Sequence, residues 1–265
     1  MSLPSLLLVG CGKMGGALWQ GWLEQGVAPS VILDRSCAAP PAPHRLARTA
    51  SEIPADFRPD IIILAVKPAG MEEALASLRP FLDGAIIISM LAARTIDSLR
   101  AACGDAASTK IVRAMPNTPA AIGKGVTGVV SQDLDEDGRT LCTALLSAVG
   151  DVAWVESEAQ LEALTPISGC GPAYVFLLAE LLEKEALRVG LPAETARLIA
   201  RGTVSGAGAL IAASDEESAT LRKNVTSPNG VTAKALDVLM APEAWPETMT
   251  RAVDQAMARA KEMAS

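Results

Sequence analysis

The feature that most constrains the fold is a glycine-rich turn between a predicted strand and a predicted helix. Residues 6–9 are a short apolar run, and Gly10, Gly12 and Gly15 follow in a Gly-x-Gly-x-x-Gly pattern that leads into a helical segment at 14–25. The first glycine permits a tight turn, the second lets the backbone approach a pyrophosphate, and the helix N-terminus supplies N–H groups and a positive dipole. In this context the pattern favours dinucleotide binding over a purely structural turn.

The first half of the chain alternates short apolar runs with helical stretches. Strands are expected at 6–9, 31–33, 61–66, 86–88, 111–112, 126–130 and 152–155, and helices at 14–25, 71–82, 96–103 and 136–149. Gly150 stands where a glycine C-cap of the last helix is expected. The alternation predicts βαβ units and a mostly parallel sheet.

The second half is rich in Ala, Leu, Glu and Arg and shows no strand-like alternation, which predicts helices alone. The helix expected at 173–189 is apolar around most of its first half, and the stretch 202–213 carries glycines typical of close helix packing. These features indicate a helical dimer interface, with a monomeric bundle as the alternative. We therefore expect an α/β fold: an N-terminal Rossmann-type dinucleotide-binding domain at 1–156, followed by an all-α C-terminal dimerisation domain at 157–265.

Charge and composition argue against several classes of protein. The net charge of -7 opposes binding to nucleic acid. No uninterrupted apolar run of about 18 to 20 residues is present, and no basic region precedes an apolar run at the N-terminus, so we expect a cytoplasmic protein without a membrane partner. Five scattered cysteines and one histidine give no metal-site spacing. His44 is expected in a solvated loop, so any catalytic proton has another source.

The residues after the second strand bear on cofactor choice. Asp34 lies nineteen residues after Gly15, where an acidic side chain would bind the adenosine ribose and favour NAD. Arg35 and Ser36 follow and could instead hold a 2′-phosphate. A third reading is that Asp34 only ends a strand in a turn.

Further polar residues are expected where strands end, which is where open α/β sheets bind ligands. Lys67 and Asn117 could contact a cofactor phosphate or carboxamide, with a solvated turn as the alternative. In the second half, the stretch 224–233 precedes a helix whose free N–H groups would suit a carboxylate, and a plain capped turn is the alternative.

Five motifs together resemble the pyrroline-5-carboxylate reductase family. They are Gly-Cys-Gly-Lys-Met-Gly-Gly-Ala from Gly10, Ala-Val-Lys-Pro at 65–68, Arg-Ala-Met-Pro-Asn-Thr-Pro at 113–119, Ser-Gly-Cys-Gly-Pro-Ala-Tyr at 168–174 and Val-Thr-Ser-Pro-Asn-Gly-Val-Thr at 225–232. The resemblance runs through essentially the whole chain. It implies reduction of 1-pyrroline-5-carboxylate to L-proline, the last step of proline biosynthesis, in a homodimer or higher homo-oligomer, with NADP as cofactor and NAD as the alternative.

The resemblance also assigns roles to residues. Backbone amides of Gly230, Val231 and Thr232 would hold the substrate carboxylate, the Thr232 hydroxyl would reach the imine nitrogen as the catalytic group, and Glu158 would lie near the substrate. The cofactor-binding residues would be Gly10, Cys11, Gly12, Lys13, Met14, Gly15, Asp34, Arg35, Ser36, Val66, Lys67, Pro68, Ala92, Asn117 and, in the nicotinamide pocket, Asn224.

Four positions depart from the family pattern, namely Ala93, Cys170, Asn229 and Val231. Asn229 replaces a common glycine, and Asn is the residue other than glycine best able to adopt positive φ, so we expect the loop shape to survive.

Three rival functions follow from the same residues. One is reduction of another cyclic imine, and a second is reduction of a β-hydroxy acid, for which the only lysine in the helix at 173–189 is Lys184, in a charged cluster that reads as a solvated face. The third is a non-catalytic dinucleotide sensor.

Overall fold

The computed structural model describes residues 3–104 and 109–264. The chain forms two compact units: unit 1 comprises Met1–Gly169 and Met257–Ser265, and unit 2 comprises Cys170–Ala256. Each unit has its own architecture.

Unit 1 is built on one sheet, which has eight strands among the described residues, in the order β3-β2-β1-β4-β5-β6-β7-β8. The strands are β1 (Leu6–Val9), β2 (Val31–Leu33), β3 (Arg45–Ala47), β4 (Ile61–Leu64), β5 (Ile86–Ser89), β6 (Lys110–Met115), β7 (Gly125–Ser131) and β8 (Gly150–Trp154). All neighbouring pairs are parallel except β6 and β7. The expected mostly parallel sheet is confirmed.

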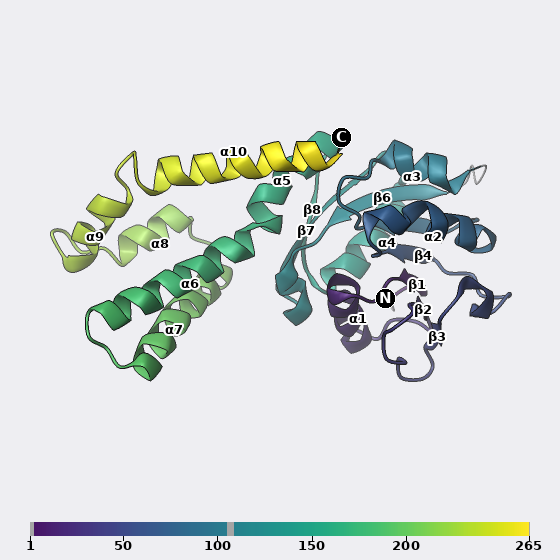
Figure 1. The fold of residues 1–265 in the computed structure, drawn as a ribbon, viewed down its shortest axis with the longest axis horizontal. Coiled ribbons are helices and arrows are strands. Elements are labelled where there is room, and N and C mark those ends of the chain that lie inside the picture. Colours follow the sequence, from purple (N-terminus) through teal and green to yellow (C-terminus); the bar gives the residue numbers. More distant parts are fainter. Residues whose placement is uncertain (1–2, 105–108, 265) are drawn as a thin grey trace. The chain divides into compact units, whose positions relative to one another are not determined.

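Helices cover both faces of this sheet (Figure 1). On one face α1 (Lys13–Glu24) and α4 (Glu136–Ser147) supply a buried cluster that includes Leu18, Trp22 and Leu145. On the other, α2 (Met71–Leu78), α3 (Ile96–Cys103) and α5 (Glu158–Leu164) pack over the opposite side chains of the same strands. Because both faces are covered, a central strand such as β4 is buried along its whole length, which explains its sequence Ile-Ile-Ile-Leu.

Short helical turns complete unit 1. They are 3-10 helices at Ala50–Glu52, Pro68–Gly70, Arg79–Phe81 and Thr118–Ile122, and a π-helix at Thr165–Gly169.

Unit 2 is helical, as expected. It contains α6 (Gly171–Arg188), α7 (Ala193–Ala212), α8 (Ser218–Asn224), α9 (Val231–Leu239) and most of α10 (Trp245–Ala264). Figure 1 shows α6 and α7 side by side. Only Ala186, Ala196 and Ala200 are buried among the described residues of this unit, whereas large apolar side chains of α6 such as Phe176, at 66%, are exposed.

One helical segment among the described residues, Glu158–Arg188, is long and apolar enough to cross a membrane by length and composition. The sequence pattern had indicated no such segment. The finding is weak as a membrane signal, because the interface helix of a soluble oligomer passes the same measure.

The structure corrects several sequence-based expectations. Gly150 does not cap a helix: α4 ends at Ser147, and Gly150 begins β8 with φ +139, where a Cβ would lie 2.0 Å from the Gly125 carbonyl oxygen. Strand β3 was missed, because its three residues carry little apolar signal. The helix expected at 71–82 ends at Leu78, before a 3-10 turn that contains a proline. In α7, a Cβ on Gly202, Gly206 or Gly208 would meet no atom of another described segment within 4 Å, so the dimer interface expected at these glycines stays a prediction.

His44 is also not the solvated loop residue that was expected. Its ring packs edge-on against Trp19, with ring centroids 5.0 Å apart, and its Nδ1 accepts a hydrogen bond from the Ser30 amide. Partial burial lowers the pKa of the imidazole. The histidine therefore has a structural role at the edge of the sheet.

Candidate active site

The glycine turn has the geometry that each of its glycines was expected to provide. Gly10 has φ +92, and a Cβ there would lie 2.8 Å from the Ala65 carbonyl oxygen of the neighbouring chain segment. A Cβ on Gly15 would lie 2.2 Å from the Gly10 carbonyl oxygen, so this glycine lets α1 pack against the turn. Gly12, the N-cap of α1, is exposed and would meet nothing within 4 Å. The helix N-terminus is thus open to a ligand at Gly12.

The parallel strands bring the expected cofactor residues to one edge of the sheet. Because β1, β2, β4, β5 and β6 run in the same direction, the segments that follow them lie at their common carboxyl edge. These segments contain Gly10, Cys11, Gly12, Lys13, Met14 and Gly15 after β1, Asp34, Arg35 and Ser36 after β2, Val66, Lys67 and Pro68 after β4, Ala92 after β5 and Asn117 after β6.

Asp34 follows the last residue of β2, and its carboxylate is occupied by its own chain. Oδ2 accepts from the Cys11 amide at 2.7 Å, and Oδ1 accepts from the amides of Ser36 and Cys37, both at 2.8 Å. Partial burial by itself raises the pKa of Asp34, but these N–H donors outweigh it and lower the pKa to about 2. The carboxylate therefore ties the glycine turn to the end of β2. By contrast, the Arg35 side chain is 88% exposed, at 3.6 Å from Glu73.

The two cysteines beside this carboxylate are protonated thiols. Burial raises the pKa of Cys11 to about 11, with smaller contributions from neighbouring Cys37 and Asp34. Burial also raises the pKa of Cys37. Because the thiolate is the reactive form, neither thiol is activated as a nucleophile at neutral pH.

Asn117 is buried, and both ends of its amide bind the protein. Its Oδ1 accepts from the Val126 amide at 2.9 Å, and its Nδ2 donates to the Ser168 carbonyl oxygen at 3.0 Å. The side chain therefore joins the end of β6 to β7 and to the π-helix. A direct contact with the cofactor stays a prediction.

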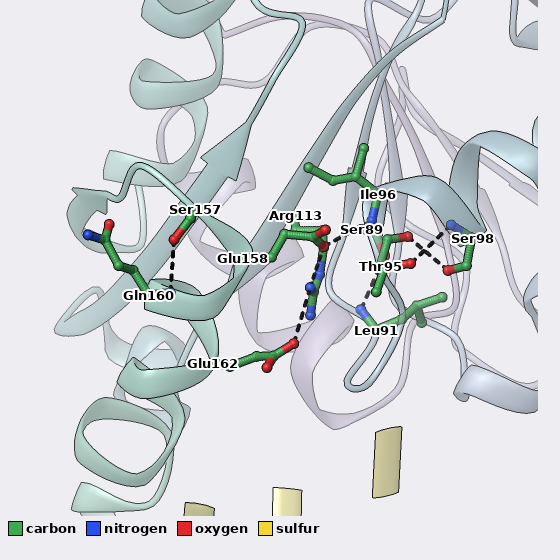
Figure 2. Close-up of polar contacts among 10 residues, drawn as sticks. All are labelled: Ser89, Leu91, Thr95, Ile96, Ser98, Arg113, Ser157, Glu158, Gln160 and Glu162. Carbon is green, nitrogen blue, oxygen red and sulfur yellow. Dashed lines mark hydrogen bonds and ion pairs between the residues drawn. The ribbon is translucent and has the colours of Figure 1, made fainter. Parts of the chain in front are cut away.

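A buried ion pair that the sequence analysis missed lies beside this edge (Figure 2). Arg113 on β6 has a 3% exposed side chain, and its Nη1 lies 2.5 Å from Oε1 of Glu158 and 3.9 Å from Oε1 of Glu162. The same Glu158 oxygen accepts the amide of Ile96, the first residue of α3, at 2.9 Å. The available signal was an arginine inside the otherwise apolar run from Ile111 to Met115.

The residues expected to bind the substrate carboxylate lie in unit 2, where α9 begins. Gly230 is the N-cap, no side chain caps the helix, and Val231 is 91% exposed. A Cβ on Gly230 would lie 2.2 Å from the Ser227 hydroxyl oxygen and 3.1 Å from the Ser227 carbonyl oxygen, so a larger residue there would require the Ser227 side chain to rotate away. Asn229 has φ +56, which confirms the expectation that this asparagine keeps the loop in the left-handed region. Thr232 is the second residue of α9 and is exposed.

Asn224, expected in the nicotinamide pocket, ends α8 and is also exposed. Its Nδ2 donates to Oε2 of Glu216 at 3.1 Å. Glu158 lies in unit 1, whereas Asn224 and α9 lie in unit 2. Among the described residues no group of three or more His, Cys, Asp or Glu side chains is arranged to hold a metal ion.

A doubly covered, mostly parallel sheet with a Gly-x-Gly-x-x-Gly turn at its carboxyl edge, followed by a helical unit with an uncovered apolar face, defines a dinucleotide-dependent oxidoreductase. Two family models match: pyrroline-5-carboxylate reductase dimerisation over residues 158–263, and NADP oxidoreductase coenzyme F420-dependent over residues 5–93.

Relatives match over nearly the full length. The pyrroline-5-carboxylate reductase of Pseudomonas aeruginosa is 34% identical over 100% of this chain and 98% of its own, and that of Haemophilus influenzae is 32% identical over 97% of both. A solved pyrroline-5-carboxylate reductase from Coxiella burnetii matches with a TM-score of 0.90 at 31% identity, covering 100% of both chains. The Plasmodium falciparum pyrroline carboxylate reductase, solved with NADP bound, matches with a TM-score of 0.83 at 28% identity, also over 100% of both chains. The chain belongs to the pyrroline-5-carboxylate reductase family.

Proposed function

We propose that this protein reduces 1-pyrroline-5-carboxylate to L-proline with NADPH. The observation that carries this proposal is the full-length relation to reductases of that name, combined with a glycine turn open at Gly12 for a pyrophosphate. The bound nicotinamide supplies the hydride for the imine carbon. The chain's own residues must bind both partners, orient them and exclude water.

The contacts of Asp34 support NADP over NAD. A carboxylate that selects NAD accepts hydrogen bonds from the ribose hydroxyls. Here Asp34 already accepts from three backbone amides, whereas Arg35 extends into solvent beside Ser36. We infer that Arg35 and Ser36 bind the 2′-phosphate, that the turn from Gly10 to Gly15 binds the pyrophosphate, and that Val66, Lys67, Pro68, Ala92, Asn117 and Asn224 contact the rest of the cofactor.

The N-terminus of α9 suits the substrate carboxylate. The N–H groups of Val231 and Thr232 have no side-chain cap, whereas that of Gly230 donates to the Ser227 carbonyl oxygen at 3.0 Å and would have to exchange this bond for the substrate carboxylate. A helix N-terminus favours an anion. The Thr232 hydroxyl would hydrogen-bond the imine nitrogen and relay a proton with solvent, which suits a chain whose one histidine packs against Trp19. A direct contact of Glu158 with substrate stays a prediction.

The exposed apolar face of α6 supports a homodimer or a higher homo-oligomer. A helical unit with three buried residues among those described has little core of its own, and a second copy would cover the exposed side chains. The division into residues 1–156 and 157–265 stays a proposal. We also propose a cytoplasmic location without nucleic-acid or membrane partners; the net charge of -7 supports the absence of a nucleic-acid partner.

The test is the loss of absorbance at 340 nm when purified protein meets 1-pyrroline-5-carboxylate with NADPH and, separately, with NADH. We expect turnover that depends on the imine and is faster with NADPH. Turnover with a six-membered imine alone, or a rise in 340 nm absorbance with NADP⁺ and a hydroxy acid alone, would show that the substrate is that compound and not 1-pyrroline-5-carboxylate. Folded protein that binds NADPH but turns over no substrate would favour the hypothesis of a non-catalytic dinucleotide sensor.

The hydroxy-acid alternative receives no support from Lys184. Its Nζ lies 2.6 Å from Oε1 of Glu180, and both side chains are more than half exposed. This lysine belongs to a solvated helix face, as the charged cluster indicated.

A further inference from the structure

The segment that follows β5, residues 90–95, is held at both ends by hydrogen bonds. We call it the β5–α3 loop. At its start, Oγ of the buried Ser89 accepts the Leu91 amide at 3.3 Å. At its end, Oγ1 of Thr95 caps α3 by accepting the Ser98 amide at 3.1 Å, and Glu158 accepts the Ile96 amide at 2.9 Å. Between these anchors the predicted cofactor residue Ala92 is exposed at the carboxyl edge.

The middle of this loop has an unfavourable backbone conformation. Ala93 has φ +59, in the left-handed region where a residue with a Cβ is disfavoured. Such a conformation persists only when the surrounding structure determines it. Within the loop, Arg94 also donates to Oε1 of Glu72 and to the Pro68 carbonyl oxygen, both at 3.1 Å. Together with these contacts, the anchors at 89–91 and 95–96 hold a shape that is unfavourable for the loop on its own.

Arg113 connects the two ends of this loop. It is the sheet partner of Ser89, so it lies beside the start of the loop. Its guanidinium binds the same Glu158 oxygen that accepts the Ile96 amide at the loop's end (Figure 2). A buried guanidinium requires a paired anion, so Arg113 fixes where the Glu158 carboxylate lies.

We propose that Arg113 is a positioning residue for hydride transfer: through Glu158 it holds the β5–α3 loop in the shape that receives the nicotinamide half of the cofactor. The inference rests on the proposed reductase function. Arg113 itself touches neither substrate nor cofactor in this scheme. The adenosine half is bound by segments after β1 and β2, on the other side of β4 in the strand order, and should not depend on Arg113.

The test measures separately how each variant binds the adenosine half of the cofactor and how well it positions the nicotinamide half. Arg113→Gln and Glu158→Gln remove the ion pair, while Glu158→Gln keeps an amide oxygen for the Ile96 N–H. Arg100→Gln is the matched control, because Arg100 also anchors α3 through an ion pair, with Asp133, but at the end remote from the loop. For each variant we would measure kcat, KM for NADPH and the affinity for 2′,5′-ADP, at a temperature where circular dichroism shows folded protein.

We expect Arg113→Gln to lower kcat by about 10- to 100-fold, the size of effect that a misplacement near 1 Å produces. Affinity for 2′,5′-ADP should stay within about twofold, since the ligands of the adenosine half are untouched. Arg113→Lys should recover part of the lost kcat, because it restores the charge without the planar guanidinium. Arg100→Gln should leave both quantities unchanged.

One measurement does not need the imine substrate. Amide hydrogen exchange of the peptide covering 89–96 should become faster in Arg113→Gln and Glu158→Gln than in Arg100→Gln. Adding Ala93→Gly to Arg113→Gln should restore part of the kcat, because glycine adopts positive φ without strain.

The proposal is overturned if the folded Arg113→Gln variant keeps wild-type kcat, or if it loses 2′,5′-ADP affinity as strongly as kcat, which would indicate general destabilisation. Should Arg113→Gln fail to fold, Glu158→Gln decides by the same criteria. A wild-type protein without imine turnover would refute the proposed function alone, and unchanged exchange at 89–96 in both variants would refute the loop proposal alone.

Discussion

Two glycines of the turn should separate stability from cofactor binding when each is replaced by alanine. Gly12 has φ -76 and ψ -155, which any residue adopts, and a Cβ there meets nothing within 4 Å. Alanine is a poorer helix N-cap than glycine by several tenths of a kcal/mol, but it lowers the entropy of the unfolded chain by about 0.4–1 kcal/mol. The two effects oppose, so the free energy of unfolding of Gly12→Ala should stay within about 0.5 kcal/mol of wild type.

Gly15→Ala should behave in the opposite way. Its Cβ would lie 2.2 Å from the Gly10 carbonyl oxygen, a backbone atom that cannot rotate aside. Overpacking costs about 1–3 kcal/mol, and the gain in helix propensity returns about 0.5–1 kcal/mol. The net loss, at most about 2.5 kcal/mol, corresponds to a fall in Tm of up to roughly 10 °C for a chain of this size.

Among these glycine-to-alanine variants, the order of cofactor affinity should differ from the order of stability. The methyl group of Gly12→Ala would occupy the space that the pyrophosphate must enter, and an overlap costing about 1–3 kcal/mol weakens binding about 5- to 150-fold. Gly16→Ala is the control, because its Cβ would lie 3.7 Å from the Cys11 carbonyl oxygen, an ordinary van der Waals contact with the turn before α1. It should keep wild-type affinity.

Urea unfolding without ligand and titration calorimetry with NADP⁺ give the two quantities separately. If Gly12→Ala bound NADP⁺ as tightly as wild type while remaining folded, the cofactor would not approach the helix N-terminus here. A large loss of stability in the same variant would instead refute the assignment of open space around Gly12.

Four further outcomes are expected. Thr232→Ala should lower kcat about 10- to 1000-fold in the 340 nm assay without changing the NADPH Kd, as expected for one positioned hydrogen-bonding group. Phe176→Glu should give a monomer by light scattering, since it places a charge on the exposed apolar face of α6. The pKa of Asp34 is lowered to about 2 from 3.8, so its stabilising effect is present above pH 3.8 and is lost as pH falls through about 2; Asp34→Asn should lack this dependence in acid unfolding. Alkylation of Cys11 by iodoacetamide, followed by mass spectrometry, should be slow at neutral pH and accelerate about tenfold per pH unit towards its pKa of about 11.

Local sequence patterns were sufficient to predict the central strands of the sheet but not all features at its edges. The strands Leu6–Val9 and Val31–Leu33 and the helix Ile96–Cys103 have the predicted bounds, because each is an apolar or capped run whose neighbours bury it. Strand β3, Arg45–Ala47, owes its strand conformation to pairing with β2, a contact from outside its own sequence. Gly150 illustrates the same limit, since its need for glycine comes from Gly125 on another strand.

The sequence also identified residues of the site more readily than the residues with which they interact. The glycine turn and Asn229 have the backbone conformations expected of them, since both follow from local residue chemistry. Arg113 escaped notice because its meaning depends on Glu158, 45 residues later, and on the Ile96 amide on a third element. The occupation of Asp34 by the amides of Cys11 and Cys37 was equally invisible, since it requires the turn and the end of β2 to meet.

The two units differ in how they can stay folded, and this difference bears on activity. Unit 1 buries two apolar clusters on opposite faces of its sheet and needs no partner for its glycine turn to keep its shape. Unit 2 carries Thr232 and the open N-terminus of α9, yet none of the residues of α9 is buried. Burial of about 25 cal/mol per Å² of apolar surface is the main force available to order such a helix, so association of subunits must supply it. Dilution below the dissociation constant of the oligomer should therefore abolish imine turnover while NADP⁺ binding by unit 1 persists.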